Sequence, residues 1–382
     1  MTEEIRMAMT LAQGAERLTA LSAALLSACR KEAFDGTVLF TPDGVGNYDA
    51  LWVRDFGYIA ESCGDLVSRE EIRRCIEFIL RGQRADGWMP DRVEAGGEAV
   101  YAAGVKGAPV GLANLDNTPF LIFAVYVYFG LVGEAAAAPL FRAWREKLDR
   151  GMACIPLSAD GLVYNEAAAP HSPYGFTDTV CKTGRLFMES VLFWRACRQM
   201  EAMHRALAGD VRIAGRYGAL AAHVERAVPA LFDAESGAFL AADGDCRQID
   251  IWGMLYALYV DFPFPAEIRA RVEAWLSENR GRYIYKGQIC QLPDGAPWEK
   301  LLIEVPAGEY QNGAYWATAS GWALDFFRRA DPAFAGEMLE ALVRDFETDG
   351  VCECINAGYR KLPQFVVSAA NVRGALLRNE RS

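Results

Sequence analysis

Two kinds of apolar pattern alternate along the chain. Six segments mix charged and apolar residues at helical spacing, which predicts amphipathic helices near residues 5–29, 68–83, 134–150, 207–230, 265–279 and 331–347. Six others are more apolar and aromatic, and they predict buried helices near 49–62, 116–131, 178–200, 249–260, 311–328 and 364–378. Each amphipathic segment is followed by a turn-rich connection and then by one apolar segment. The pattern therefore predicts a mainly helical protein built from paired helices.

The helix pairs recur with a loose period, since successive apolar segments begin 53 to 72 residues apart. Each connection contains an Asp-Gly turn signal, and residues 37–40, 162–164 and 238–240 beside such turns fit short strands of β-hairpins. Repetition of this kind is typical of stacked helical hairpins, in an open solenoid or a closed ring. A closed ring explains why one set of predicted helices is apolar nearly all round, because the amphipathic helices would form an outer ring that covers them. We therefore predict one all-α domain over residues 1–382, an (α/α)6 toroid with β-hairpins in the connections at one end.

Composition narrows the class of protein. Of the 382 residues 52% are hydrophobic, enough for a large core, and the net charge of −11 without a basic run argues against nucleic acid or an anionic membrane as partner. The ten cysteines are scattered, and the N-terminal sequence MTEEIRMAMTLAQGAERL has no cleavable signal, which predicts reduced thiols and a cytoplasmic location. No charge-free apolar run of about 18 residues occurs, so we expect no membrane span.

In a closed ring the connections and the N-termini of all inner helices meet at one end. Taken singly, Asp116, Asp178 and Asp250 each fit a helix cap, and tryptophans at helical spacing fit a core. Together the residues there predict a polar cavity lined by aromatics, which suits sugars because carboxylates and amides bond hydroxyls while aromatic rings stack on sugar rings. Paired carboxylates could also supply the acid and base of glycosidic bond cleavage. The candidates are Trp52, Arg54, Asp55, Asp91, Asp116, Asn117, Asp178, Lys182, Gln248, Asp250, Trp252, Glu309, Tyr310, Gln311, Asn312 and Trp316.

Three short segments resemble the six-hairpin glycosidases, the (α/α)6 enzymes that include glucoamylases and trehalases. They are Trp52-Val53-Arg54-Asp55, Phe176-Thr177-Asp178 and Gly308-Glu309-Tyr310-Gln311-Asn312-Gly313. The resemblance implies that Arg54 and Asp55 hold hydroxyls of the terminal sugar, that Asp178 is the general acid and that Glu309 is the base. Thr177 stands where trehalase-like enzymes have tryptophan, and the glycine run before the glutamate is shortened to Gly308. The identity of the sugar therefore stays open.

We hypothesise an exo-acting, inverting glycoside hydrolase that cleaves a small oligosaccharide without metal or cofactor. Glu166 and Glu353 are alternatives for either catalytic role, and Lys182 would either pair with Asp178 or contact substrate. The other substrate-binding candidates are those named above. The oligomeric state stays open.

Other functions of a toroid also stay open, namely a non-catalytic sugar-binding protein, an epimerase, an uronide hydrolase or a phosphorylase. Epimerases of this shape use histidine pairs, whereas this chain has only His171, His204 and His223. Cys352-x-Cys354 lacks a second cluster at zinc spacing, so we interpret it as structural.

Overall fold

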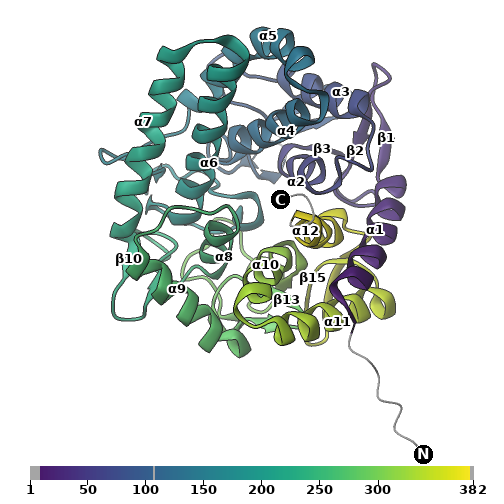
Figure 1. Cartoon of the computed structure of the whole chain (residues 1–382), viewed down its shortest axis with the longest axis vertical. Coiled ribbons are helices and arrows are strands. Elements are labelled where there is room, and N and C mark those ends of the chain that lie inside the picture. The colour runs from purple at the N-terminus through teal and green to yellow at the C-terminus, as the bar shows by residue number, and fades with distance from the viewer. Residues whose placement is uncertain (1–8, 106–107, 379–382) are drawn as a thin grey trace, which may run out of the picture.

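A computed structural model describes residues 9–105 and 108–378 (Figure 1). Six helices surround the centre of the molecule, and each contacts the next, including the last with the first. The chain is therefore a closed ring, as the sequence predicts. These inner helices are α2 (Val53–Cys63), α4 (Asn117–Val132), α6 (Phe187–Met203), α8 (Ile251–Tyr259), α10 (Ser320–Ala330) and α12 (Val366–Leu377).

Six further helices form the outer ring and precede the inner helices one by one along the chain. They are α1 (Leu11–Ala28), α3 (Arg69–Arg81), α5 (Glu134–Ala153), α7 (Val211–Ala227), α9 (Ala266–Glu278) and α11 (Pro332–Asp349). The two rings differ in burial as their sequence patterns require. All nine residues of α8 are buried, whereas α3 buries Ile72, Cys75, Ile76 and Ile79 on one face among its charged residues.

The third and fifth inner helices begin later than the sequence pattern predicts. Helix α6 begins at Phe187 instead of near 178, and α10 begins at Ser320 instead of near 311. Residues 178–186 are mostly extended, and Val180 forms a β-bridge with Leu301. Gly313 has φ 113°, which no helix contains, and residues 315–316 form a strand. An apolar run that is buried as a strand looks the same in sequence as a buried helix, which explains the error.

All the short strands lie in the connections that lead into the inner helices. Strands form at all three predicted places, but only the first and third belong to hairpins, since the strand at 164–165 pairs with residues 184–185; the largest sheet has five strands in the order β12-β13-β14-β15-β16. Every pairing is antiparallel. The strands are β1 (Arg30–Glu32), β2 (Val38–Phe40), β3 (Ala50–Trp52), β4 (Arg92–Glu94), β5 (Ala99–Val100), β6 (Gly104–Val105), β7 (Ala108–Pro109), β8 (Tyr164–Asn165), β9 (Gly184–Arg185), β10 (Phe232–Asp233), β11 (Ala238–Phe239), β12 (Ile284–Tyr285), β13 (Gln288–Cys290), β14 (Tyr315–Trp316), β15 (Cys352–Asn356) and β16 (Tyr359–Pro363).

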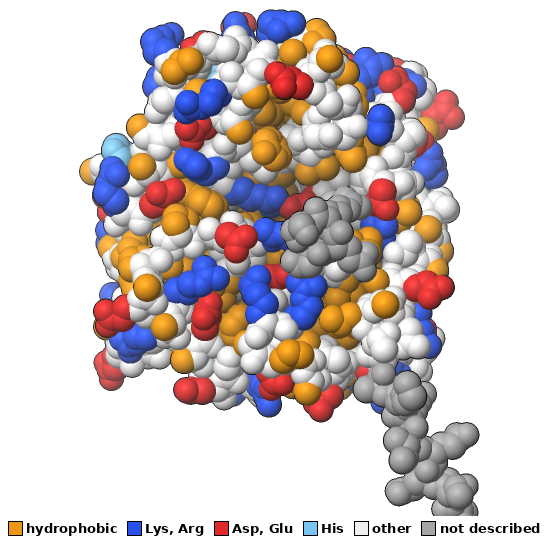
Figure 2. Space-filling view, viewed as in Figure 1, with side chains coloured by type: hydrophobic (Ala, Val, Ile, Leu, Met, Phe, Trp, Pro, Cys, Tyr) orange, Lys and Arg blue, Asp and Glu red, His pale blue; other side chains and the backbone are white. Residues whose placement is uncertain are grey.

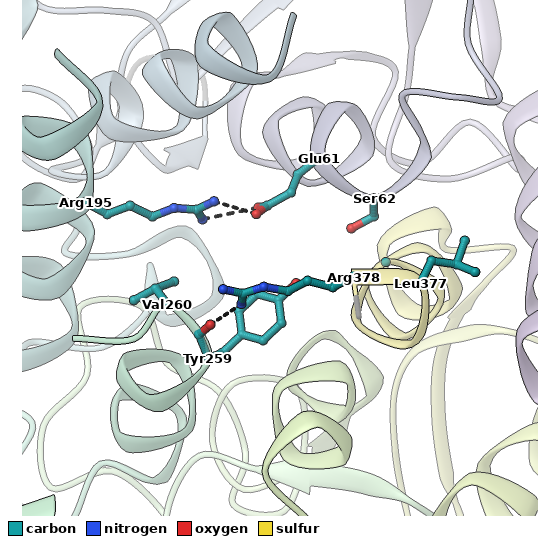
Figure 3. Close-up of a pocket in the computed structure, with 8 residues that line it drawn as sticks. Glu61, Ser62, Arg195, Tyr259, Val260, Leu377 and Arg378 are labelled. Carbon is teal, nitrogen blue, oxygen red and sulfur yellow. Dashed lines mark hydrogen bonds and ion pairs between the residues drawn. The ribbon is translucent and has the colours of Figure 1, made fainter. Parts of the chain in front are cut away.

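The opposite end of the ring, where the inner helices finish, is closed by arginines. Arg195 of α6 donates to both carboxylate oxygens of Glu61 on α2, at 3.2 and 2.5 Å, and Arg378 donates to the carbonyl oxygen of Tyr259 (Figure 3). The hollow between these groups encloses about 880 Å³. Basic side chains gather around the centre of this face (Figure 2). Positive charge here complements the negative C-terminal ends of the inner helices.

All ten cysteines lie among the described residues, and none is in a disulfide. Within the same ranges of the chain, no helix is both long and apolar enough to cross a lipid bilayer.

Candidate active site

A small cavity lies at the end of the ring where the connections gather, and it encloses about 330 Å³ of empty space. Its walls come from segments far apart in sequence, because the ring brings the first, third, fifth and sixth connections together. The lining residues are Pro42, Tyr48, Trp52, Arg54, Asp55, Gly175, Phe176, Asp178, Tyr310, Glu353 and Phe365.

The floor of the cavity is a buried ion-pair cluster around Arg54. Its guanidinium donates to Asp116 at 2.7 and 3.2 Å and to Asp91 at 3.0 Å, and all three side chains are at most 3% exposed. Asn114 and Arg92 also donate to Asp91, at 3.0 and 3.1 Å. Asp91 and Asp116 therefore hold Arg54 in place beneath the cavity, and neither is among the residues that line it.

Gly175 lets the backbone of the third connection lie against this arginine. A Cβ atom built on Gly175 would be 1.6 Å from Cζ of Arg54, so no larger residue fits beside the guanidinium. The amide N–H of Gly175 also donates to Asp116, at 3.0 Å. A 3-10 turn, Gly175–Thr177, then carries the chain to Asp178 at the cavity.

Asp178 is a partly buried carboxyl group at the wall of the cavity. Its Oδ1 accepts a hydrogen bond of 2.8 Å from Nε2 of Gln311. Removal from water raises the pKa of Asp178 to about 7; the Arg54 guanidinium opposes the rise, while the charge of Asp91 adds to it. A carboxyl with such a pKa can hold a proton at neutral pH.

Asp55 lies in the first turn of α2 and is 4% exposed. Its Oδ1 has no hydrogen-bond partner among the described residues, although the side chain lines the cavity. Burial raises the pKa of Asp55 to about 7 against the effect of Arg54, and the charge of Glu353 contributes to the rise. An unpartnered buried oxygen at a cavity is a site for a hydroxyl donor from a ligand.

Glu353 enters the cavity from β15 with a lysine beside it. Its Oε1 accepts from the Tyr48 hydroxyl at 2.8 Å, and its Oε2 is 3.0 Å from Nζ of Lys361 on β16. Burial raises the pKa of Glu353, whereas the Lys361 ammonium and the Tyr48 hydroxyl favour the ionised form. The Lys361 ammonium also lies 3.2 Å from the centre of the Tyr310 ring.

Aromatic rings form the remaining wall. Trp52 packs edge-on against Tyr48 with ring centres 5.2 Å apart, and the Arg92 guanidinium lies over the Trp52 ring at 4.6 Å. Tyr310 has φ 42°, an uncommon value for a bulky residue, and its ring packs on Trp316 at 5.2 Å. Such strain is often found at functional sites, and aromatic faces suit the apolar faces of a sugar.

Several of the predicted residues use their polar groups in hydrogen bonds within the protein, and these residues do not line the cavity. Lys182 is 1% exposed and donates to Glu189 at 2.5 Å, so it pairs with neither Asp178 nor a ligand. Asp250 caps α8 by accepting from the amide of Gly253 at 2.8 Å, and the indole N–H of Trp252 donates to the Ile289 carbonyl. The side-chain amides of Asn117, Gln248, Gln311 and Asn312 donate to backbone carbonyls of the connections, and Trp316 packs against Tyr310.

Glu309 is also absent from the residues that line the cavity. Its amide N–H donates to the Pro306 carbonyl, and its own carbonyl accepts from Asn312, so residues 306–312 form a tight turn that is partly exposed. Glu166 lies on the exposed surface of the third connection. Glu353, of the three glutamates considered from the sequence, is the one that the structure places in the cavity.

Several other residues of the site had not been singled out as binding candidates. Phe176 stands inside a segment that carries the resemblance, and Tyr48 lies shortly before another, so their position was a usable signal. Lys361 and Phe365 follow the last Asp-Gly turn, where the short strand β16 carries no local sign of a site. Only the pairing of β15 with β16 puts Lys361 next to Glu353.

The ring and its one-ended cavity define the class of fold, the six-hairpin (α/α)6 toroid. No family model and no curated sequence matches this chain. Solved structures do match. A rhamnosidase from Klebsiella oxytoca with rhamnose bound has a TM-score of 0.67 and 12% identity over 98% of this chain, and this chain covers 65% of that one, less than two thirds of its length.

Two further neighbours are similar over nearly their whole length. A mannosylglycerate hydrolase of glycoside hydrolase family GH63 from Thermus thermophilus, in complex with glucose, has a TM-score of 0.66 and 16% identity, covering 94% of this chain and 99% of its own. A glucoamylase from Saccharomycopsis fibuligera has a TM-score of 0.62 and 12% identity, covering 100% and 98%. The chain therefore has the fold of the six-hairpin glycosidases, as the sequence resemblance implies.

Proposed function

We propose that this protein is an exo-acting, inverting glycoside hydrolase with Asp178 as the general acid and Glu353 as the general base. The observation that carries the proposal is that these two carboxyl groups line one small cavity and have different hydrogen-bonding neighbours. Asp178 receives a hydrogen bond from a neutral amide, whereas Glu353 lies beside an ammonium group. Environments that separate two carboxyl groups in this way assign acid and base roles.

The electrostatic neighbours also support two separate positions for these groups. The charge of Glu353 raises the pKa of Asp55 on α2, and Asp178 is influenced chiefly by Arg54, Asp91 and Asp116. The charges of Asp178 and Glu353 both raise the pKa of the Tyr48 and Tyr310 hydroxyls, which line the same cavity. The proposed reaction places a sugar and a water molecule between the acid and the base.

The reaction follows from these roles. Asp178 donates its proton to the glycosidic oxygen as the bond from that oxygen to the anomeric carbon breaks. Glu353 removes a proton from a water molecule, whose oxygen forms a bond to the anomeric carbon from the opposite face. The configuration inverts, which requires the carboxyl groups to be about 6.5–9.5 Å apart when they hold substrate. Release of the proton from Glu353 and protonation of Asp178 restore the starting state.

The size of the cavity favours attack on one terminal sugar. The empty space among the lining residues is only about 330 Å³, including the part open to solvent, and such a narrow site favours the end of a sugar chain over the interior of a polymer. Arg54 and Asp55 offer a donor and an unpartnered acceptor for hydroxyl groups, and the aromatic wall packs against the sugar ring. Small soluble glycosides also fit the cytoplasmic location that the sequence predicts.

The names of the structural neighbours support the same class of reaction. A rhamnosidase, a mannosylglycerate hydrolase and a glucoamylase are all enzymes that act on glycosidic bonds. Their differing sugars leave the glycone of this protein to experiment. The histidine chemistry of an epimerase gains no support, because His171 bonds to the Ala113 carbonyl and packs on Trp88 outside the cavity.

The test is a hydrolysis screen of the whole chain with α- and β-glycosides of glucose, mannose, galactose and rhamnose, with and without phosphate. Asp178→Asn and Glu353→Gln should each lower kcat/KM on the substrate found by roughly 10²–10⁴-fold. A glycosyl fluoride, whose leaving group needs little protonation, should restore much of the activity of Asp178→Asn and none of that of Glu353→Gln.

Glu309→Gln decides between the two candidate bases, because it makes the same chemical change outside the cavity. We expect Glu309→Gln to keep activity near that of the wild type. Loss of activity in Glu309→Gln together with an active Glu353→Gln would overturn the assignment of the base. Turnover of no glycoside by the folded protein would overturn the proposed function.

A further inference from the structure

Gln311 is the most completely bonded amide near the cavity. It is 1% exposed, and its Nε2 donates to Oδ1 of Asp178 at 2.8 Å and to the Gly175 carbonyl at 3.0 Å. Its Oε1 accepts from the backbone N–H of Thr179 at 2.9 Å and from the Thr179 hydroxyl at 2.7 Å. Every hydrogen-bonding position of this amide is therefore used within residues 175–179.

The orientation of the amide follows from chemistry. A backbone N–H can only donate, so the Gln311 atom opposite Thr179 must be the oxygen. The nitrogen then faces Oδ1 of Asp178 and the Gly175 carbonyl, and a carbonyl can only accept. The Thr179 N–H and the Gly175 carbonyl therefore each exclude the flipped orientation.

We propose that Gln311 is a positioning residue that determines which oxygen of Asp178 carries the catalytic proton. Because Gln311 always donates to Oδ1, that oxygen cannot hold a proton directed at the amide, and the acid proton is placed on Oδ2. The same bond fixes the rotation of the carboxyl group. This inference rests on the proposed function, since it assumes that Asp178 is the general acid.

The inference differs from a purely structural role, for which Gln291 is the matched comparison. Gln291 is also buried and also ties the same turn to the fifth connection, by donating to the Phe176 carbonyl at 2.5 Å and accepting from the Trp298 indole at 2.9 Å. It makes no hydrogen bond to Asp178. A variant at Gln291 therefore loosens the turn without removing a donor from the acid.

Loss of the Gln311 donor changes the titration of the acid in a defined direction. The donor favours the ionised carboxyl, so its removal raises the pKa of Asp178 further. Since a general acid works only when protonated, the high-pH limb of the kcat/KM profile moves to higher pH. The charged or titratable groups that influence Asp178 otherwise are Arg54, Asp91, Asp116, Tyr48 and Tyr310, and the variant leaves all of them in place.

The experiment compares the pH profiles of wild type, Gln311→Leu, Gln311→Glu and Gln291→Leu on a glycoside with a poor leaving group and on the glycosyl fluoride. Both Gln311 variants should lose about tenfold to a hundredfold in kcat on the glycoside, a part of the roughly 10²–10⁴-fold that acid catalysis contributes. The high-pH limb should move up by about one pH unit in Gln311→Leu, as expected for a lost hydrogen bond to a charged group, and by more in Gln311→Glu, because a second carboxyl group beside Asp178 also raises its pKa. On the fluoride the loss should be small, and Gln291→Leu should keep the wild-type limb on both substrates.

Gln311→Glu keeps the size of the side chain and its acceptor toward Thr179, so it serves if Gln311→Leu fails to fold. An unmoved limb in a folded Gln311 variant, or equal losses on the glycoside and the fluoride, would overturn the positioning role. If Asp178→Asn itself keeps full activity on the glycoside, the proposed function fails first, and that result is distinct from a failure confined to Gln311.

Discussion

Replacing Arg54 with methionine should destabilise the protein far more than the loss of an ordinary surface ion pair. The wild-type guanidinium is buried and faces two carboxylates that are themselves fully buried, Asp91 and Asp116. Methionine fills much of the space but leaves both carboxylates with less compensation. Asp91 keeps its contacts with Arg92 and Asn114, and Asp116 keeps the amide of Gly175.

The magnitude follows from the burial of the cluster. Breaking a buried ion pair by removing one partner costs about 3–5 kcal/mol, because a charge is left without compensation in a dry site. For 382 residues the unfolding entropy is about 0.8 kcal/mol/K, so Tm should fall by about 4–6 °C. Adding Asp116→Asn to Arg54→Met should recover part of this loss, since it removes one of the uncompensated charges.

The assay is equilibrium unfolding in guanidinium chloride together with a thermal scan, with Arg282→Met as the matched control. Arg282 pairs with Asp294 on the surface, with the two side chains 49% and 59% exposed. Pairs of that kind contribute about 0–1 kcal/mol. If Arg54→Met is as stable as Arg282→Met, the buried ion pairs of Arg54 do not stabilise the fold, which would contradict this prediction.

Three further changes test other parts of the site. Lys361→Gln removes the cation beside Glu353, so the pKa of that carboxyl should rise. The low-pH limb of the kcat/KM profile should then move to higher pH, and a limb that stays in place would contradict the role of the ion pair. Gly175→Ala should lower kcat by about 10²-fold, because the new Cβ would overlap the Arg54 guanidinium and displace the groups of the site, and a displacement of about 1 Å can cost that much. Normal kinetics would show that the close approach of Gly175 to Arg54 does not matter. Asp55→Asn should lower kcat/KM by about tenfold to a hundredfold, as expected for a lost hydrogen bond between a hydroxyl and a charged group, and an unchanged value would remove Asp55 from the sugar site.

The two rings could be predicted from the sequence because burial differs so strongly between them. Helix α8 is apolar all round and lies wholly in the core, whereas α3 shows one apolar face between charged residues. The starts of the helices were harder to predict, since residues 178–186 and 311–316 are mostly buried without being helical. Burial determines the pattern of apolar residues, whereas strand pairing between the connections determines whether the backbone is extended or helical.

The site could be predicted only where a residue lies close to a helix start on the ring axis. Trp52, Arg54 and Asp55 follow directly from the start of α2, and the structure places all three at the cavity. Lys182 lies only four residues after Asp178 in the sequence, yet its side chain donates to Glu189 in the core. The local sequence does not determine which way a connection turns. The position of Glu353 beside Lys361 depends on the β15–β16 hairpin, which lies between α11 and α12.

In the proposed reaction Asp178 and Glu353 act from opposite sides of one sugar, with water attacking from the side of Glu353. The most direct measurement is the anomeric configuration of the first sugar released, followed by proton NMR from the moment of mixing and before mutarotation. We expect the anomer opposite to that of the substrate. Release of the same anomer would contradict it, because retention requires carboxyl groups only about 5–5.5 Å apart and a covalent intermediate in place of direct attack by water.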